Sequence, residues 1–182
     1  MRCSFCDTQY AYENGPEMSL TEICTEVKKH NCRLVEITGG EPLVQPDTPK
    51  LIQRLIKNGF EVMLETNGTI DTKDIDKRCM KIIDIKCPSS NQSEKNNFIN
   101  LKRLTKKDQI KFVIGTREDF DFAKRTLKYY QPKLAHDHIL FSPAFKQLSA
   151  ANLARWILED NLDVRLQLQI HKVIWPNKDR GV

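Results

Sequence analysis

Two cysteines near the start of the chain could hold a soft metal centre. Cys3 and Cys6 stand in a C-x-x-C spacing, which lets two thiolates reach one zinc ion or one iron–sulfur cluster. A zinc ribbon needs a second C-x-x-C, and the sequence has none. A redox disulfide is an alternative, but Ser4-Phe5 gives no helix-start signal of the thioredoxin kind. A thiol-bound metal centre is therefore a candidate, although this loop offers fewer cysteines than such a centre usually uses.

A glycine turn further along could bring bare backbone against a ligand. The segment Thr38-Gly39-Gly40-Glu41-Pro42 closes a short hydrophobic run, and glycine at a strand end permits close approach. The remaining cysteines carry less information. Cys24, Cys32 and Cys79 are interpreted as small buried hydrophobes, and the role of Cys87, directly after a strand end, stays open.

The composition describes a globular chain without a membrane or secretory signature. The 182 residues are 40% hydrophobic and 29% charged, which suits one domain spanning 1–182. The sequence shows no apolar run long enough for a membrane span and no signal peptide. Irregularly spaced cysteines in a lysine-rich chain favour the reducing cytoplasm. The net charge of +5 is spread over helix-like faces, which predicts a solvated surface and no direct nucleic-acid contact.

Strand-like and helix-like segments alternate along the chain. The hydrophobic pattern predicts strands at 34–38, 60–66, 81–86, 109–114, 138–142 and 163–170. Helices are predicted at 19–30, with a capping box at Ser19 and Glu22, and at 49–57, 118–130 and 149–159. Repeated strand–helix units imply a parallel sheet with right-handed crossovers, so the fold class is α/β.

Unusual residues gather where the predicted strands end. They are Thr38 to Glu41, Glu65 to Gly68, Asp84 with Lys86, and Ser142-Pro143. Parallel α/β folds bind ligands at the carboxyl ends of their strands. Each group alone is compatible with ordinary turn chemistry, but four groups at one edge of one sheet favour a shared ligand cleft.

The thiol loop and the glycine turn together resemble those of radical S-adenosylmethionine (SAM) enzymes. The Cys6-Asp7-Thr8 triplet and the run 84–90, D-I-K-C-P-S-S, narrow the resemblance to the 7-carboxy-7-deazaguanine synthase family. The segments 65–68, 141–143, 169–172 and 181–182 extend it over essentially the whole chain. The resemblance implies a partial, open (β/α) barrel of the radical SAM type.

One departure from the family pattern concerns the cluster loop. The family uses C-x-x-x-C-x-x-C, and by that spacing its first cysteine falls just upstream of Met1. The first strand and an upstream Gly-Glu-Gly segment are also absent, so we expect a truncated or mis-started chain. Two alternatives stay open: Cys87 or another thiol completes the cluster, or the protein has lost its activity.

The resemblance assigns roles residue by residue. Cys3 and Cys6 are implied ligands of a [4Fe–4S] cluster, and Thr8 is an implied Mg²⁺ ligand. Thr38 and Val182 are implied substrate contacts. The implied SAM-binding residues are Phe5, Cys6, Asp7, Gly40, Asp84, Ile85, Lys86, Ser142, Pro143, Ala144 and Phe145.

The implied reaction is a ring contraction in 7-deazapurine biosynthesis. 6-Carboxy-5,6,7,8-tetrahydropterin loses ammonia and becomes 7-carboxy-7-deazaguanine, with SAM acting as a regenerated cofactor. The resemblance also implies a flavodoxin or ferredoxin as electron donor and a homodimer. Rival interpretations are another radical SAM enzyme, such as a glycyl-radical activase, and a thiol-bound metal module or nucleic-acid binder without catalytic activity.

Overall fold

A computed structural model describes residues 1–6, 9 and 15–178. Its centre is a six-stranded parallel sheet in the order β1-β2-β3-β4-β5-β6. The strands are β1 (Leu34–Ile37), β2 (Glu61–Thr66), β3 (Met80–Ile85), β4 (Gln109–Ile114), β5 (Ile139–Pro143) and β6 (Arg165–Leu166). Among the described strands β1 and β6 are edges, so the sheet stays open, as the resemblance implies.

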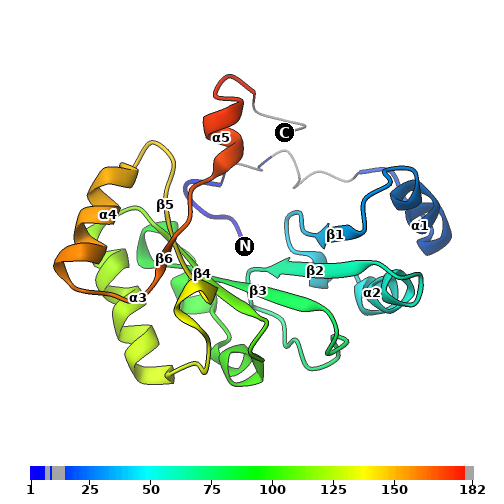
Figure 1. Cartoon of the computed structure of the whole chain (residues 1–182), viewed down its shortest axis with the longest axis horizontal. Helices are drawn as coiled ribbons and strands as arrows, with labels where there is room; N and C mark the ends of the chain where they lie inside the picture. The colour runs from blue at the N-terminus through cyan, green and yellow to red at the C-terminus, as the bar shows by residue number, and fades with distance from the viewer. Residues whose placement is uncertain (7–8, 10–14, 179–182) are drawn as a thin grey trace.

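Helices connect the strands as the alternation predicts. They are α1 (Leu20–Lys28), α2 (Thr48–Lys57), α3 (Arg117–Tyr130), α4 (Ala150–Glu159) and α5 (Ile170–Ile174). Short 3₁₀ helices also lie in the described part of the chain: η2 (Pro42–Val44), η3 (Pro88–Ser90), η4 (Ser93–Lys95), η5 (Phe98–Arg103) and η6 (His136–His138). Figure 1 shows α1 and α2 at one end of the sheet and α3 and α4 at the other, with the start of the chain and α5 between them.

One predicted element is wrong in extent. The alternating segment 163–170 predicts a full strand, but only Arg165–Leu166 pairs with β5, and Ile170 already begins α5. The chain continues alongside the sheet for one more bond, from the Gln167 N–H to the Phe141 carbonyl at 2.9 Å. A short edge strand limits unwanted pairing with other chains, which the sequence pattern does not reveal.

The capping box predicted for the first helix is confirmed, and a second one was missed. Ser19 accepts a hydrogen bond from the Glu22 N–H, and the Glu22 carboxylate accepts from the Ser19 N–H at 2.7 Å. The same reciprocal pair forms between Thr116 and Asp119 at the start of α3. Each box supplies partners to N–H groups that the first helical turn leaves unpaired.

Two apolar clusters bury the helix side of the sheet. One joins α1 and α2 to the first strands and contains Cys24, Ile52, Leu55, Val62, Leu64, Ile75 and Cys79. The other lies with α3 and α4 and contains Ile83, Ile85, Cys87, Leu101, Ile110, Phe112, Ile114, Phe120, Ala123, Phe141, Leu153 and Ile157. Strand side chains alternate between faces, so the opposite face receives the polar residues Glu36, Glu65, Asp84, Lys111 and Ser142.

None of the helices in the described part of the chain is long and apolar enough to cross a membrane.

Candidate functional site

The thiol loop is seated on the segment that follows β3. The Ser4 hydroxyl donates to the Ser89 carbonyl at 2.7 Å, and the Ser4 N–H donates to the Ser90 carbonyl at 3.2 Å. The Cys6 N–H donates to the Cys3 carbonyl at 3.3 Å, which closes the loop into a turn. Sequence positions 3–6 and 84–90 are therefore brought together at the carboxyl end of β3, as the predicted shared cleft requires.

The Cys3 thiol faces the charged end of β3. It is half-buried, and this burial raises its pKa. The neighbouring Lys86 ammonium acts in the opposite direction, whereas the negative charges of Asp84 and Cys6 add to the upward shift. The Lys86 ammonium thus favours the ionised form of Cys3, which is the form of a thiol that binds metal.

Asp84 and Lys86 form a buried ion pair at this end of β3. The Lys86 Nζ lies 2.8 Å from Asp84 Oδ2, and burial, which would lower the pKa of Lys86, is outweighed by the charge and hydrogen bond of Asp84. Asp84 Oδ1 is buried without a hydrogen-bond partner among the described residues. A buried carboxylate oxygen normally has a partner, so the free oxygen fits a ligand that brings a donor, such as an ammonium group.

A second buried ion pair, at the opposite end of β3, shows what a structural pair looks like. Lys81 Nζ lies 2.9 Å from Asp108 Oδ2, and the same carboxylate accepts from the Lys81 N–H and from the Thr105 N–H and hydroxyl. Both oxygens of Asp108 are satisfied. The contrast with Asp84 places the ligand-accepting carboxylate at the carboxyl end of the sheet.

The glycine turn is fastened to the end of β2 by Glu41. The Glu41 carboxylate accepts from the Thr66 hydroxyl at 2.7 Å, the Asn67 N–H at 2.8 Å and the Leu43 N–H at 3.0 Å. Gly39 has φ +136°, a conformation that favours glycine. We call these three hydrogen bonds the Glu41 clamp. The sequence did not predict this role for Glu41, although an acidic residue directly after two glycines could have indicated it.

The glycine turn leaves its implied binding residues open. Thr38 and Gly40 are both exposed. Their exposure at the carboxyl end of β1 keeps them available to a ligand. The hydrogen bonds of Glu41 to the end of β2 fix the turn, so its exposed backbone at Gly40 can stay open to a ligand.

Charged side chains continue across the polar face of the sheet. Lys111 Nζ on β4 lies 2.7 Å from Glu65 Oε1 on β2. Burial would lower the pKa of Lys111, but Asp84 and Glu65 raise it overall. On β1, partial burial and the charge of Glu65 raise the pKa of Glu36. Sequence analysis missed Glu36 and Lys111, although each alternates with apolar neighbours inside a predicted strand.

The loop after β5 lies at the same edge. Ser142 and Ala144 are buried, and the Ala144 N–H donates to the Ile114 carbonyl at 2.8 Å. Phe145 is 46% exposed, and the ammonium groups of Lys146 and Lys172 lie 5.4 Å and 5.6 Å from its ring centre. Lys172 belongs to α5, so this contact connects α5 to the loop.

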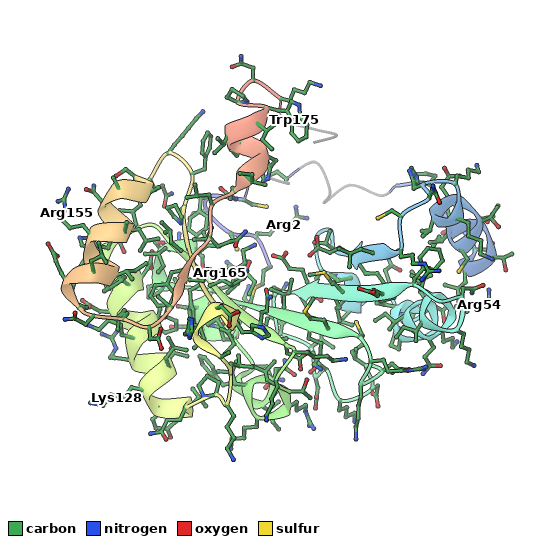
Figure 2. All side chains as sticks on the ribbon, viewed as in Figure 1. Arg2, Arg54, Lys128, Arg155, Arg165 and Trp175 are labelled. Carbon is green, nitrogen blue, oxygen red and sulfur yellow. The ribbon has the colours of Figure 1, made fainter. Side chains whose placement is uncertain are left out.

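Some implied residues lie elsewhere or outside the described chain. The Ile85 side chain is in the apolar cluster beside α3 and α4, so only its backbone reaches the polar face. Pro143 is half-buried at the end of β5, and Phe5 is half-buried in the thiol loop. Asp7, Thr8 and Val182 lie outside the described residues. In Figure 2, Arg2 lies between α5 and the sheet.

The other thiols do not join the loop. Cys24 and Cys79 are buried, as predicted, but Cys32 is exposed, because it precedes the edge strand β1 where no helix covers it. Cys87 is 1% exposed within the second apolar cluster, and burial raises its pKa well above its usual value. Within the described residues no group of three or more His, Cys, Asp or Glu side chains is placed to hold a metal ion.

Comparisons with known proteins agree with this geometry. The model of the radical SAM superfamily matches residues 1–133. The chain is 39% identical to 7-carboxy-7-deazaguanine synthase of Koribacter versatilis, covering 100% of this chain and 87% of the relative. It is 40% identical to the enzyme of the same name from Chlorobaculum tepidum, covering 99% and 83%.

Solved structures share the fold. The crystal structure of QueE from Escherichia coli aligns with a TM-score of 0.66 at 22% identity, covering 92% of this chain and 79% of that chain. Streptococcus suis SuiB bound to S-adenosylmethionine aligns with a TM-score of 0.61 at 12% identity, covering 99% and 50%. With the sequence relatives, these findings show that the chain belongs to the 7-carboxy-7-deazaguanine synthase family of the radical SAM superfamily.

Proposed function

We propose that this protein converts 6-carboxy-5,6,7,8-tetrahydropterin into 7-carboxy-7-deazaguanine and ammonia; the names of its relatives give the same product. The observation that carries the proposal is the seat of Cys3 and Cys6 beside Asp84 and Lys86 at the carboxyl end of β3. Two candidate thiolate ligands and a buried carboxylate with one free oxygen lie together there. In a radical SAM enzyme, such a place could bind an iron–sulfur cluster and SAM.

The donor set fits part of a [4Fe–4S] site. Cys3 and Cys6 would supply two thiolates, and Cys87 is not a third, because its side chain is enclosed in the apolar cluster. When bound, the cluster and SAM supply the hydrogen-abstracting radical chemistry. Thr8 would contribute to a Mg²⁺ site.

This chain's own residues would bind and orient SAM. Asp84 Oδ1 can accept a hydrogen bond from an ammonium group, while the ion pair with Lys86 holds the Asp84 side chain in place. Phe5, Cys6, Asp7, Gly40 and the loop 142–145 would complete the SAM site. Gly40 is exposed and has no side chain, so SAM could approach its backbone closely. The bond between Glu41 and the Asn67 N–H keeps this turn in place.

The polar face of the sheet would receive the pterin. Thr38 and the terminal Val182 are the proposed substrate contacts. The paired charges of Glu65 and Lys111 would keep this face polar without leaving either charge unpaired. We also propose a flavodoxin or ferredoxin as electron donor, a homodimer, no direct contact with nucleic acid, and a cytoplasmic location.

Anaerobic reconstitution tests the function. The chain, extended at its start by the cysteine that the family pattern C-x-x-x-C-x-x-C places upstream of Met1, is loaded with iron and sulfide. Its cluster is measured by iron content and electron paramagnetic resonance, and the pterin is supplied with SAM and dithionite. We expect cluster signal and 7-carboxy-7-deazaguanine, both lost in Cys3→Ser and Cys6→Ser. Cys32→Ser is the matched control, because Cys32 is an exposed thiol away from the loop.

Each rival has a distinct outcome in this assay. A cluster with SAM cleavage but no pterin product would favour another radical SAM enzyme, such as a glycyl-radical activase. Equal iron content in Cys3→Ser and the unmodified chain would contradict the assigned cluster ligands. Salt-sensitive RNA binding without a cluster would favour the binding module.

A further inference from the structure

A relay of hydrogen bonds connects the thiol loop to the start of α3. Its first step is Ser4, between the two cysteines, whose hydroxyl and N–H both donate to carbonyls of η3. These bonds, of 2.7 Å to Ser89 and 3.2 Å to Ser90, join residues far apart in the sequence. The position of the loop therefore depends on the position of η3.

The second step fixes η3 through Asp119. The Ser89 N–H donates to Asp119 Oδ1 at 2.9 Å, and the Ser89 hydroxyl donates to Asp119 Oδ2 in a very short contact. Both oxygens of one carboxylate thus hold one residue. Two hydrogen bonds to one carboxylate fix both the position and the orientation of Ser89.

Helix capping alone does not account for Asp119. The Asp119 carboxylate also accepts from the Gly115 N–H at 2.8 Å and the Thr116 N–H at 3.0 Å, and the residue is fully buried. Glu22 occupies the equivalent place in the α1 capping box, but it is exposed and accepts a hydrogen bond from the Ser19 N–H. A cap needs no such burial and no bidentate grip on another segment.

A third segment meets the relay at Gly115. A Cβ atom added at Gly115 would collide with the Gln147 side chain and would lie 3.1 Å from Ser89 Oγ. Gln147 lies two residues after Phe145, the last residue of the proposed SAM-binding segment 142–145. Ser89 and Gly115 both bond to the Asp119 carboxylate, the thiol loop is bound to η3, and Gln147 lies beside Gly115.

We infer that Asp119 is a positioning residue, which sets the place of Cys3 and Cys6 relative to Asp84, Lys86 and the loop after β5. It acts through Ser89 and Ser4 and touches no reacting atom. Its importance for catalysis rests on the proposed function, in which Cys3 and Cys6 bind the cluster. The geometric part of the inference does not, since it concerns the loop itself.

The first experiment uses the metal-free chain and needs no activity. Iodoacetamide alkylation of Cys3 is measured against Cys32 in the same molecule by fragmentation mass spectrometry. Cys3 is half-buried in its seat and Cys32 is exposed, so Cys32 serves as an internal reference. We expect Ser4→Ala and Asp119→Asn to raise the Cys3-to-Cys32 ratio at least about threefold, because access governs thiol reactivity.

Glu22→Gln is the matched control, because it alters the same position of a capping box far from the thiol loop. We expect its ratio to match the unmodified chain. If Asp119→Asn unfolds the protein, the buried Cys79 and Cys87 will be alkylated as well, and Ser4→Ala and Ser89→Ala then decide the question. An unchanged ratio in Ser4→Ala would overturn the inference.

A second experiment links the relay to the cluster. After reconstitution, iron release to a chelator should be at least about threefold faster in Ser4→Ala than in Glu22→Gln, because a loop that opens more often exposes its thiolates. Equal release rates would show that the relay does not secure the cluster. Failure of the proposed function is distinguishable, because it would appear as no cluster or no pterin turnover with the alkylation result intact.

Discussion

At the scale of single residues, the buried carboxylates differ in how completely their oxygens are hydrogen-bonded. Asp108 and Asp119 are fully buried and each accepts several hydrogen bonds. Asp84 is buried to a similar degree, yet its Oδ1 has no partner among the described residues. Since a buried lone oxygen is costly, its persistence is best explained by a ligand that completes it.

Replacement of Lys86 by methionine should strongly destabilise the metal-free chain. The change leaves the Asp84 carboxylate buried without its cation, and breaking a buried ion pair costs about 3–5 kcal/mol. Urea denaturation measures the free energy of unfolding. The double variant Asp84→Asn/Lys86→Met should recover much of the loss, because no bare charge remains.

Lys50→Met is the control for Lys86→Met. Lys50 pairs with Asp47 on the surface, where both side chains are more than half exposed. Exposed pairs contribute roughly 0–1 kcal/mol, so this variant should unfold almost as the unmodified chain does. Similar losses for Lys50→Met and Lys86→Met would contradict the buried-pair account.

Glu36 should make stability depend on pH in an unusual direction. Partial desolvation on the sheet and the charge of Glu65 raise the pKa of Glu36 above 4.5, so the folded state holds this proton more tightly than the unfolded state. The free energy of unfolding therefore falls as pH rises from about 4.5 through the raised pKa. Glu36→Gln should remove this decline, which urea denaturation at several pH values can detect; an unchanged pH profile would contradict it.

At the scale of elements, the site is made of strand ends and the turns after them. Glu41 joins the turn after β1 to the end of β2, because its carboxylate accepts hydrogen bonds from the Thr66 hydroxyl and the Asn67 N–H. Asp119 joins the segment after β3 to the start of α3. In both cases one carboxylate connects two crossovers, so neighbouring units of the sheet keep their spacing.

Gly68 should tolerate alanine far less well than Gly59. Both have left-handed φ, +69° and +86°, so both substitutions strain the backbone. A Cβ at Gly68 would also lie 2.8 Å from Ile83 Cγ2, whereas one at Gly59 meets nothing within 4 Å. We expect Gly68→Ala to cost about 1–3 kcal/mol more than Gly59→Ala in urea denaturation, because it overpacks the core. Equal losses of unfolding free energy would show that the Ile83 side chain on β3 moves aside without a measurable cost.

At the scale of the whole molecule, the two ends of the sheet carry ion pairs of different kinds. Lys81 and Asp108 form a satisfied pair at the amino end of β3, and Asp84 and Lys86 form an unsatisfied one at its carboxyl end. Parallel barrels place their active sites at the carboxyl end, and the opposite end serves stability.

This division predicts different effects for the two lysines. Lys81→Met should lower the free energy of unfolding by about 3 kcal/mol or more, because it leaves the buried Asp108 carboxylate without its cation. After reconstitution, it should leave SAM affinity within about twofold of the unmodified chain, whereas Lys86→Met should weaken it at least about tenfold, a change of 1.4 kcal/mol. Isothermal titration calorimetry compares them. Equal losses of SAM affinity would contradict the division.

The sequence by itself determined the parallel α/β class, most element positions and the groups at the strand ends. Hydrophobic periodicity is a local property, and the carboxyl ends of parallel strands share one edge whatever their exact order. The same local pattern overextended the segment 163–170, because alternation does not reveal that an edge strand stops after Leu166. Cys32 was misjudged similarly, since burial depends on which helix covers a strand.

Only the tertiary structure decided which residues act together. The grip of Asp119 on Ser89, the clamp of Glu41 on β2 and the pair of Lys111 with Glu65 all join positions far apart in the sequence. The free oxygen of Asp84 likewise becomes visible only when every neighbouring donor has been placed. Residue type and spacing name the candidate groups, but hydrogen-bond satisfaction depends on three-dimensional distance, which spacing along the chain does not fix.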